Sequence, residues 1–80
     1  MKYEVIVKLK EDVFDPESKA IYQTLQRVGV EQIKNITITR RYVVEVEERS
    51  KESGAAVDRL ASTYLSNPVS EMYTIRKLTQ

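Results

Sequence analysis

The stretch YEVIVKL, residues 3–9, decides the fold, because apolar side chains recur in it at every second position. This period of two is typical of a β-strand that is buried on one side. The buried side of this predicted strand holds Tyr3, Val5, Val7 and Leu9.

A helix is predicted after a short polar loop. Asp15 can accept hydrogen bonds from the first free helical N–H groups, and Pro16 supplies a preset φ at the first helical position. Gly29 can adopt the left-handed conformation that ends a helix, so we expect a helix over residues 16–28. Its predicted core-facing stripe consists of Ile21, Leu25 and Val28.

Two strands are predicted next, over residues 33–39 and 42–47, since both segments are rich in β-branched residues. A single strand of this combined length would be unusual. We therefore place a hairpin bend near residues 39–41, with Arg40 and Arg41 at its tip.

A second helix and a last strand complete the order. Apolar residues at helical spacing run from Val57 to Tyr64 and end before Asn67-Pro68, and residues 72–78 alternate again. The predicted order β-α-β-β-α-β is the ferredoxin-like α+β fold, a single domain over residues 1–80 in which both helices cover one face of an antiparallel sheet.

The other sheet face would then be uncovered and half apolar. If Val5, Ile36, Val44 and Ile75 point toward the helices, that face carries Ile6, Thr37, Thr39, Val43, Glu45 and Thr74. So short a chain buries only about 60–65% of its unfolded surface. We therefore expect a homo-oligomer, a dimer or a tetramer, and the alternative is a solvated face with scattered apolar residues.

The composition excludes several classes of function. The 80 residues include no histidine and no cysteine, and the formal net charge is +1. Histidine-based catalysis, thiol chemistry and the usual zinc sites are thereby removed, and the charge is not that of a nucleic-acid-binding protein. We expect no catalytic, cofactor-binding or metal-binding residues and no nucleic-acid partner. Without a leader-like or membrane-length apolar run, we expect a cytoplasmic protein with no membrane partner.

Three groups of side chains could still form sites. The carboxylates near residues 11–15 lack the spacing and the glycine of a calcium loop. We interpret them as a polar loop with a helix cap, and those near residues 45–48 as a solvated strand edge. Four of the five tyrosines, Tyr3, Tyr42, Tyr64 and Tyr73, are expected at or near the core. Arg40 and Arg41 remain as candidate contacts to an acidic partner, and the alternative is a solvated turn.

Three segments in order resemble a known family. They are residues 5–17, which end in VFDPE, residues 25–29, and residues 64–75, which contain YLSNPV. Together they resemble PurS, the small subunit of phosphoribosylformylglycinamidine synthase. The family's second strand usually carries an Arg and then Gly-Lys, whereas this chain has Thr37, Thr39 and then the basic Arg40.

The resemblance implies a subunit of an ATP- and glutamine-dependent ligase of purine biosynthesis. It further implies that the small subunit is not the catalyst and that paired copies bridge the glutaminase and synthetase subunits and assist ammonia transfer. ATP and magnesium are expected in the synthetase subunit and not on this chain. The strands and Arg40-Arg41 would contact the larger subunits.

Two other functions share this fold order. One is a regulatory module that binds a small molecule at a dimer interface, although such sites usually need a glycine in the loop after the first strand, and residues 10–14 have none. The other is an RNA-recognition module, which the acidic residues Glu45 and Glu47 disfavour.

Overall fold

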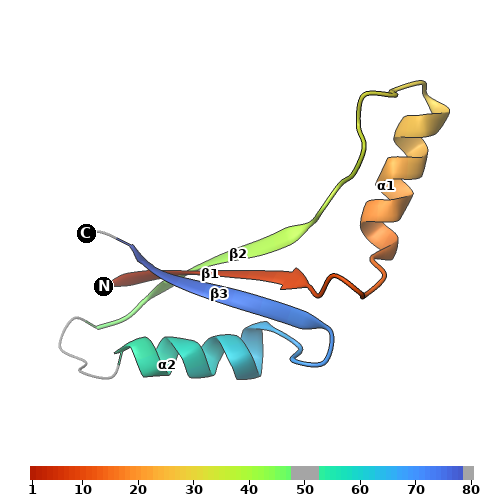
Figure 1. Ribbon diagram of the computed structural model, residues 1–80. Helices are drawn as coiled ribbons and strands as arrows, with labels where there is room; N and C mark the ends of the chain where they lie inside the picture. The colour runs from red at the N-terminus through yellow and green to blue at the C-terminus, as the bar shows by residue number, and fades with distance from the viewer. Residues whose placement is uncertain (48–52, 79–80) are drawn as a thin grey trace.

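The computed structural model describes residues 1–47 and 53–78 and contains a three-stranded antiparallel sheet. The strands are β1 (Lys2–Leu9), β2 (Thr39–Glu45) and β3 (Glu71–Leu78). Strand β1 lies in the centre, with β2 and β3 on either side (Figure 1). The predicted α+β class with an antiparallel sheet and two helices is confirmed.

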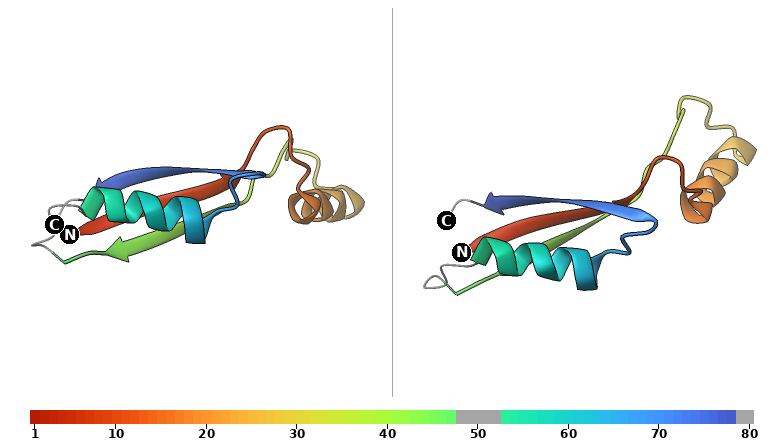
Figure 2. Two further views of the ribbon diagram at one scale, coloured as in Figure 1. Left: turned by 90° about the horizontal axis from the view of Figure 1, so that it is seen from below. Right: turned by 60° about the horizontal axis from the view of Figure 1, so that its bottom comes forward.

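The two helices occupy different places. Helix α2 (Ser53–Leu60) continues into a π-helical turn, η1 (Ala61–Leu65), and lies against one face of the sheet. Helix α1 (Pro16–Arg27) lies beyond the end of the sheet in every view (Figure 2). Only one of the two helices therefore covers the sheet within one copy of the chain. The prediction that both helices cover it is wrong for a single copy.

The core lies between the sheet and α2. Its buried apolar residues come from β1, α2 and the start of η1: Tyr3, Val5, Val7, Val57 and Ala61. The side chains of β2 and β3 that point the same way are half-buried and pack around them, as Val44 and Ile75 do. We call this the helix-side face, and the opposite side of the sheet the open face.

We call residues 16–38 the arm. None of the twelve described residues of α1 is buried. The backbone groups of residues 31–37, which follow the helix, form no hydrogen bond with other backbone groups of the described residues. The arm gives the molecule extents of 54 × 29 × 14 Å and a radius of gyration of 16.5 Å. A compact domain of this length would have a radius of gyration of about 12 Å.

The predicted strand over residues 33–39 and the bend at residues 39–41 are wrong. Among the described residues there is no strand between α1 and Thr39, and β2 runs without a bend from Thr39 to Glu45. The reason is the length of β1, whose last pairs are Lys8 with Thr39 and Leu9 with Glu71. Residues 31–37 extend past this end, where β1 offers no backbone for them to pair with.

The predicted start and end of the first helix are confirmed. Asp15 Oδ1 accepts hydrogen bonds from the backbone N–H of Glu17 at 3.1 Å and of Ser18 at 3.3 Å, and Pro16 occupies the first turn. Gly29 has a φ of +85° just after the helix, a conformation that costs a residue with a Cβ about 1–2 kcal/mol. The boundaries of α1 were therefore readable from the sequence, although its packing was not.

Among the described residues, no helix is long and apolar enough to cross a membrane.

The wider i→i+5 turn of η1 changes the predicted apolar stripe of the second helix. Val57 and Ala61 are buried as predicted, but Tyr64 is 76% exposed. The expectation that Tyr64 belongs to the core is wrong, because the π-helical turn is out of phase with a 3.6-residue stripe.

Candidate functional site

The two arginines predicted at a hairpin tip lie in the first half of β2 and point to opposite faces of the sheet. Arg40 pairs in register with Val7 and shares the helix-side face, whereas Arg41 pairs with Ile6 on the open face. This follows from strand geometry, in which successive side chains alternate between faces. The two residues therefore belong to separate sites.

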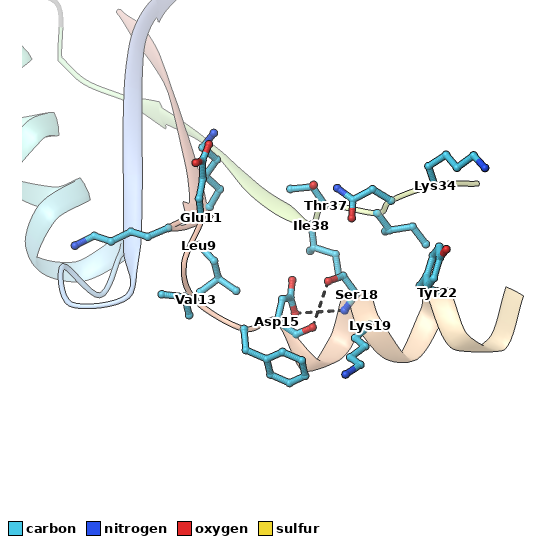
Figure 3. Close-up of a pocket in the computed structure, with 15 residues that line it drawn as sticks. Leu9, Glu11, Val13, Asp15, Ser18, Lys19, Tyr22, Lys34, Thr37 and Ile38 are labelled. Atoms are coloured by element: carbon cyan, nitrogen blue, oxygen red, sulfur yellow. Dashed lines mark hydrogen bonds between the residues drawn. The ribbon is translucent and has the colours of Figure 1, made fainter. Parts of the chain in front are cut away.

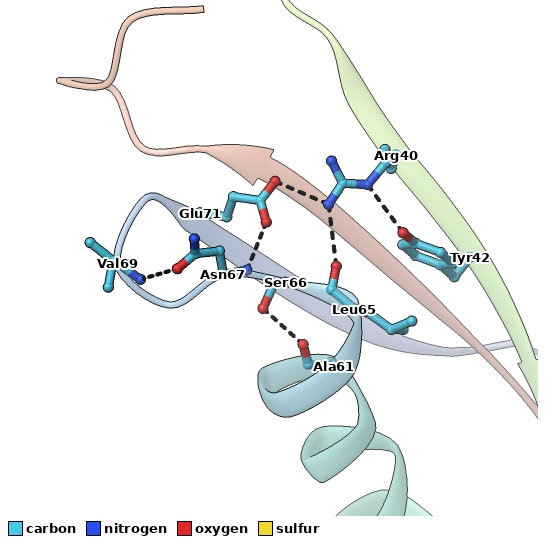
Figure 4. A network of polar contacts seen from close by, with 8 residues as sticks. All are labelled: Arg40, Tyr42, Ala61, Leu65, Ser66, Asn67, Val69 and Glu71. Atoms are coloured by element: carbon cyan, nitrogen blue, oxygen red, sulfur yellow. Dashed lines mark hydrogen bonds and ion pairs between the residues drawn. The ribbon is translucent and has the colours of Figure 1, made fainter.

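Arg40 is the centre of a polar network at one end of the helix-side face (Figure 4). Its guanidinium donates to the hydroxyl of Tyr42 at 3.1 Å, to the carbonyl of Leu65 at 3.2 Å and to the carboxylate of Glu71 at 3.0 Å. The bond to Tyr42 and the pairing with Glu71 raise the pKa of Arg40, so its charge is secure. Arg40 thereby joins β2 to the end of η1 and the start of β3.

The same network fixes the loop that precedes β3. The second oxygen of Glu71 accepts the backbone N–H of Asn67 at 2.7 Å, and the side chain of Asn67 accepts that of Val69 at 3.0 Å. Lys10 donates to the carbonyl of Pro68 at 3.0 Å. Most donors of this network are used within the chain, so Arg40 has a structural role as well as any role toward a partner.

Arg41 forms a second ion-pair site on the open face. Its Nε donates to Glu4, and Arg76 from β3 contacts the other oxygen of the same carboxylate at 3.2 Å. The hydrogen bond from Arg41 is the largest influence on the pKa of Glu4; it lowers that pKa, burial opposes the effect, and Arg76 lowers the pKa further. The carboxylate is therefore held in its charged form.

Two hydrogen bonds fasten α2 to the sheet. The buried hydroxyl of Tyr3 is 2.9 Å from the Oγ of Ser53, and the hydroxyl of Tyr73 donates to Asp58 at 2.7 Å. The bond to Asp58, followed by burial, raises the pKa of Tyr73 and keeps it a donor. Tyr3, Tyr42 and Tyr73 thus lie at or near the core, as predicted.

A pocket of about 630 Å³ lies between α1, the loop after β1 and residues 34–38 (Figure 3). Four lysines line it. Lys10 bonds the carbonyl of Pro68, and Lys19 Nζ lies 5.1 Å from the ring centre of Phe14, which also lines the pocket. The inner wall carries apolar side chains such as Leu9, Val13 and Ile38. The pocket is thus the gap between α1 and residues 34–38 of the arm, bordered by the loop after β1.

The predicted acidic groups do not form a metal site among the described residues, in which no three potential ligands gather. Asp15 serves as the helix cap, while Glu11 and Asp12 are exposed in the loop before it. Glu48, which the second acidic group included, lies outside the described residues.

The sequence matches a family model described as "PurS: Phosphoribosylformylglycinamidine (FGAM) synthase" over residues 2–79. The chain belongs to the PurS family. It is similar to the FGAM synthase subunit PurS of Archaeoglobus fulgidus, with 30% identity over 90% of this chain and 91% of that protein.

Solved PurS structures share the fold. The Bacillus subtilis PurS structure superposes with a TM-score of 0.85 at 25% identity, covering 94% of each chain. A chain in the structure of PurLQS from Thermotoga maritima superposes with a TM-score of 0.73 at 25% identity, covering 96% of this chain and 95% of that chain. Membership in PurS makes this chain a subunit of FGAM synthase, a ligase of purine biosynthesis, as the resemblance implied.

Arg40 and Arg41 stand out in the sequence as a basic pair, but their partners do not. Glu4, Glu71 and Arg76 lie on other strands, and only the strand register brings them together. The one available signal was the charged Glu4 between the apolar Tyr3 and Val5, because a carboxylate there needs a basic neighbour once the strand is central. Of the two threonines that depart from the PurS pattern, Thr37 lines the pocket and Thr39 begins β2.

Proposed function

We propose that this chain is a cytoplasmic, non-catalytic small subunit that works in pairs to bridge the glutaminase and synthetase subunits of FGAM synthase and to assist ammonia transfer. ATP and magnesium would act in the synthetase subunit. The observation that carries this proposal is the arm, which leaves α1 without a buried residue and so leaves the fold incomplete in one copy. The chemistry of the chain supports it, since the sequence has no histidine and no cysteine.

The arm favours a second copy as its covering surface. An amphipathic helix gains stability mainly by packing its apolar face, and residues 31–37 offer a strand-like backbone with hydrogen-bonding groups still available. A copy related by a two-fold axis would bring an identical arm and an identical sheet end, so that each covers the other. The apolar residues available for this contact, exposed or half-buried in one copy, are Phe14, Ile21, Leu25, Val28, Ile33, Ile36 and Ile38.

This arrangement would restore in two copies what the sequence predicts for one. The alternating segment 33–39 would gain a strand neighbour, and the stripe of α1 would gain a sheet face. Dimer formation is tested by light scattering at micromolar concentration, where we expect a mass of at least twice 9.3 kDa. A single-chain mass would contradict the paired arrangement.

The assembly with larger subunits is supported by the match to a chain in PurLQS of Thermotoga maritima. The decisive experiment reconstitutes FGAM synthesis from the synthetase and glutaminase subunits with and without this chain. We expect glutamine-dependent turnover to require the chain and ammonia-dependent turnover to be nearly independent of it. Equal glutamine-dependent rates in its presence and absence would overturn the proposed function.

A further inference from the structure

The open face has a definite composition that the strand register fixes. Every second residue of each strand points to it, and α2 lies on the other side of the sheet (Figure 2). Its charged members are four cations and two carboxylates: Lys2, Lys8, Arg41, Arg76, Glu4 and Glu45. Its apolar members include Ile6, Val43 and Met72, of which Val43 is 50% exposed and Met72 is 41% exposed.

Glu4 lies at the centre of this face but is not available to a partner. Its side chain is only 9% exposed, because Arg41 from one neighbouring strand and Arg76 from the other lie against it. Both arginine side chains remain accessible, at 54% and 69%. Among the described residues of the three strands, the surface presented to a partner therefore carries four cations and one accessible carboxylate, Glu45.

The two arginines are also oriented in advance. A guanidinium has five N–H donors, and Glu4 engages only part of this set on each arginine. Since Glu4 already fixes one side of each guanidinium, less side-chain entropy remains to be lost when a second carboxylate binds. Arginine beside exposed apolar side chains is a composition typical of the most strongly contributing parts of protein interfaces.

The charge of the face selects among possible occupants. Two copies placed open face to open face would bring like charges together, which is unfavourable at an interface. The apolar residues between the charges fit a protein surface better than a nucleic-acid backbone. The covering surface should therefore be a protein that contributes carboxylates.

Resting on the proposed function, we propose that the open face, with Arg41 and Arg76 at its centre, binds a carboxylate-bearing surface of a larger FGAM synthase subunit. The arm then serves the contact between copies, and the open face serves the contact with the rest of the enzyme. Each of the two surfaces has one kind of partner.

The test measures the affinity of this chain for the immobilised larger subunits at low and high salt. Arg41→Ala and Arg76→Ala should each weaken binding by roughly tenfold or more, and Arg76→Lys should retain part of it. Binding of the wild type should weaken with salt, and the double variant should show less of this dependence. Lys77→Ala is the matched control, since Lys77 is exposed on the same strand but points to the helix-side face.

Several outcomes would overturn the inference. If both arginine variants bind as the wild type does, the open face is not the docking surface. If the variants instead lower the homo-oligomer mass in light scattering, the open face is a contact between copies. Circular dichroism establishes that each variant is folded, and should Arg41→Ala not fold, Arg76→Ala decides, because its side chain is the more exposed. If wild-type chain binds no larger subunit at all, the proposed function fails as well.

Discussion

Two regions of the molecule, the sheet with α2 and the arm, have similar apolar sequence patterns. The apolar side chains are buried in the first region and exposed in the second. Val57 on α2 and Ala61 at the start of η1 form an apolar stripe and are buried. Ile21 on α1 and Val28 at its C-terminal cap form a comparable stripe and are exposed. The first stripe meets the helix-side face of its own sheet. The second meets no such surface within residues 1–47 and 53–78 of the same chain. An amphipathic pattern therefore predicts that a helix will be covered, but it does not specify which chain covers it.

The largest expected effect comes from charging the buried region. Val5 is fully buried between α2 and the sheet, and Val5→Asp would place an unpaired carboxylate there, with a cost of about 3–5 kcal/mol. Because the core has so few members, we expect the variant to be unfolded at room temperature. A cooperative thermal transition by circular dichroism would contradict the division into a packed region and an arm.

The same chemical change in the arm should act on assembly and not on folding. Ile21 is 42% exposed in one copy, so Ile21→Asp should preserve the circular dichroism spectrum and reduce the light-scattering mass to that of one chain. Gln23→Asp on the same helix is the control, because Gln23 lies off the apolar stripe. If Ile21→Asp keeps the full oligomer mass, the arm is not the contact between copies.

A smaller effect is expected from removing one hydroxyl. Tyr3→Phe deletes the buried hydrogen bond to Ser53 and should lower the free energy of unfolding by about 1 kcal/mol. Tyr22→Phe in the arm is the comparison, because its hydroxyl makes no hydrogen bond with the described residues, and its effect should stay within about 0.5 kcal/mol. Urea denaturation measures the free energy of unfolding of both variants. Equal losses would contradict the difference between the packed region and the arm.

The smallest effect concerns pH and the open face. The pKa of Glu4 in the folded chain lies below its ordinary value, so Glu4 stabilises the fold above the unfolded pKa of about 4.3, and this stabilisation is lost as the pH falls through the folded pKa. The wild type should melt higher than Glu4→Gln at neutral pH, with the difference disappearing in acid. A difference that is constant with pH would contradict the ion pairs as its source.

Local signals in the sequence predicted most elements. Asp15, Pro16 and Gly29 determine the limits of α1 through backbone hydrogen bonds and φ, which depend on near neighbours only. The strand periodicity likewise predicted β1 and β3. The predicted strand over residues 33–39 does not form in one copy because a strand needs a neighbour, and β1 ends too early to supply it.

The candidate site was predicted only in part for the same reason. Arg40 and Arg41 were found as a basic pair, but strand alternation separates them onto two faces. Their carboxylate partners, Glu71 and Glu4, lie on other strands and are brought near by register alone. Residue type was therefore readable from the sequence, and pairing was not.

Hydrogen–deuterium exchange of residues 31–37 tests most directly the claim that a second copy completes the arm. At concentrations where light scattering shows an oligomer, we predict slow exchange in this segment, and on dilution to single chains we predict fast exchange while β1 remains protected. Fast exchange of residues 31–37 at every concentration would contradict the claim.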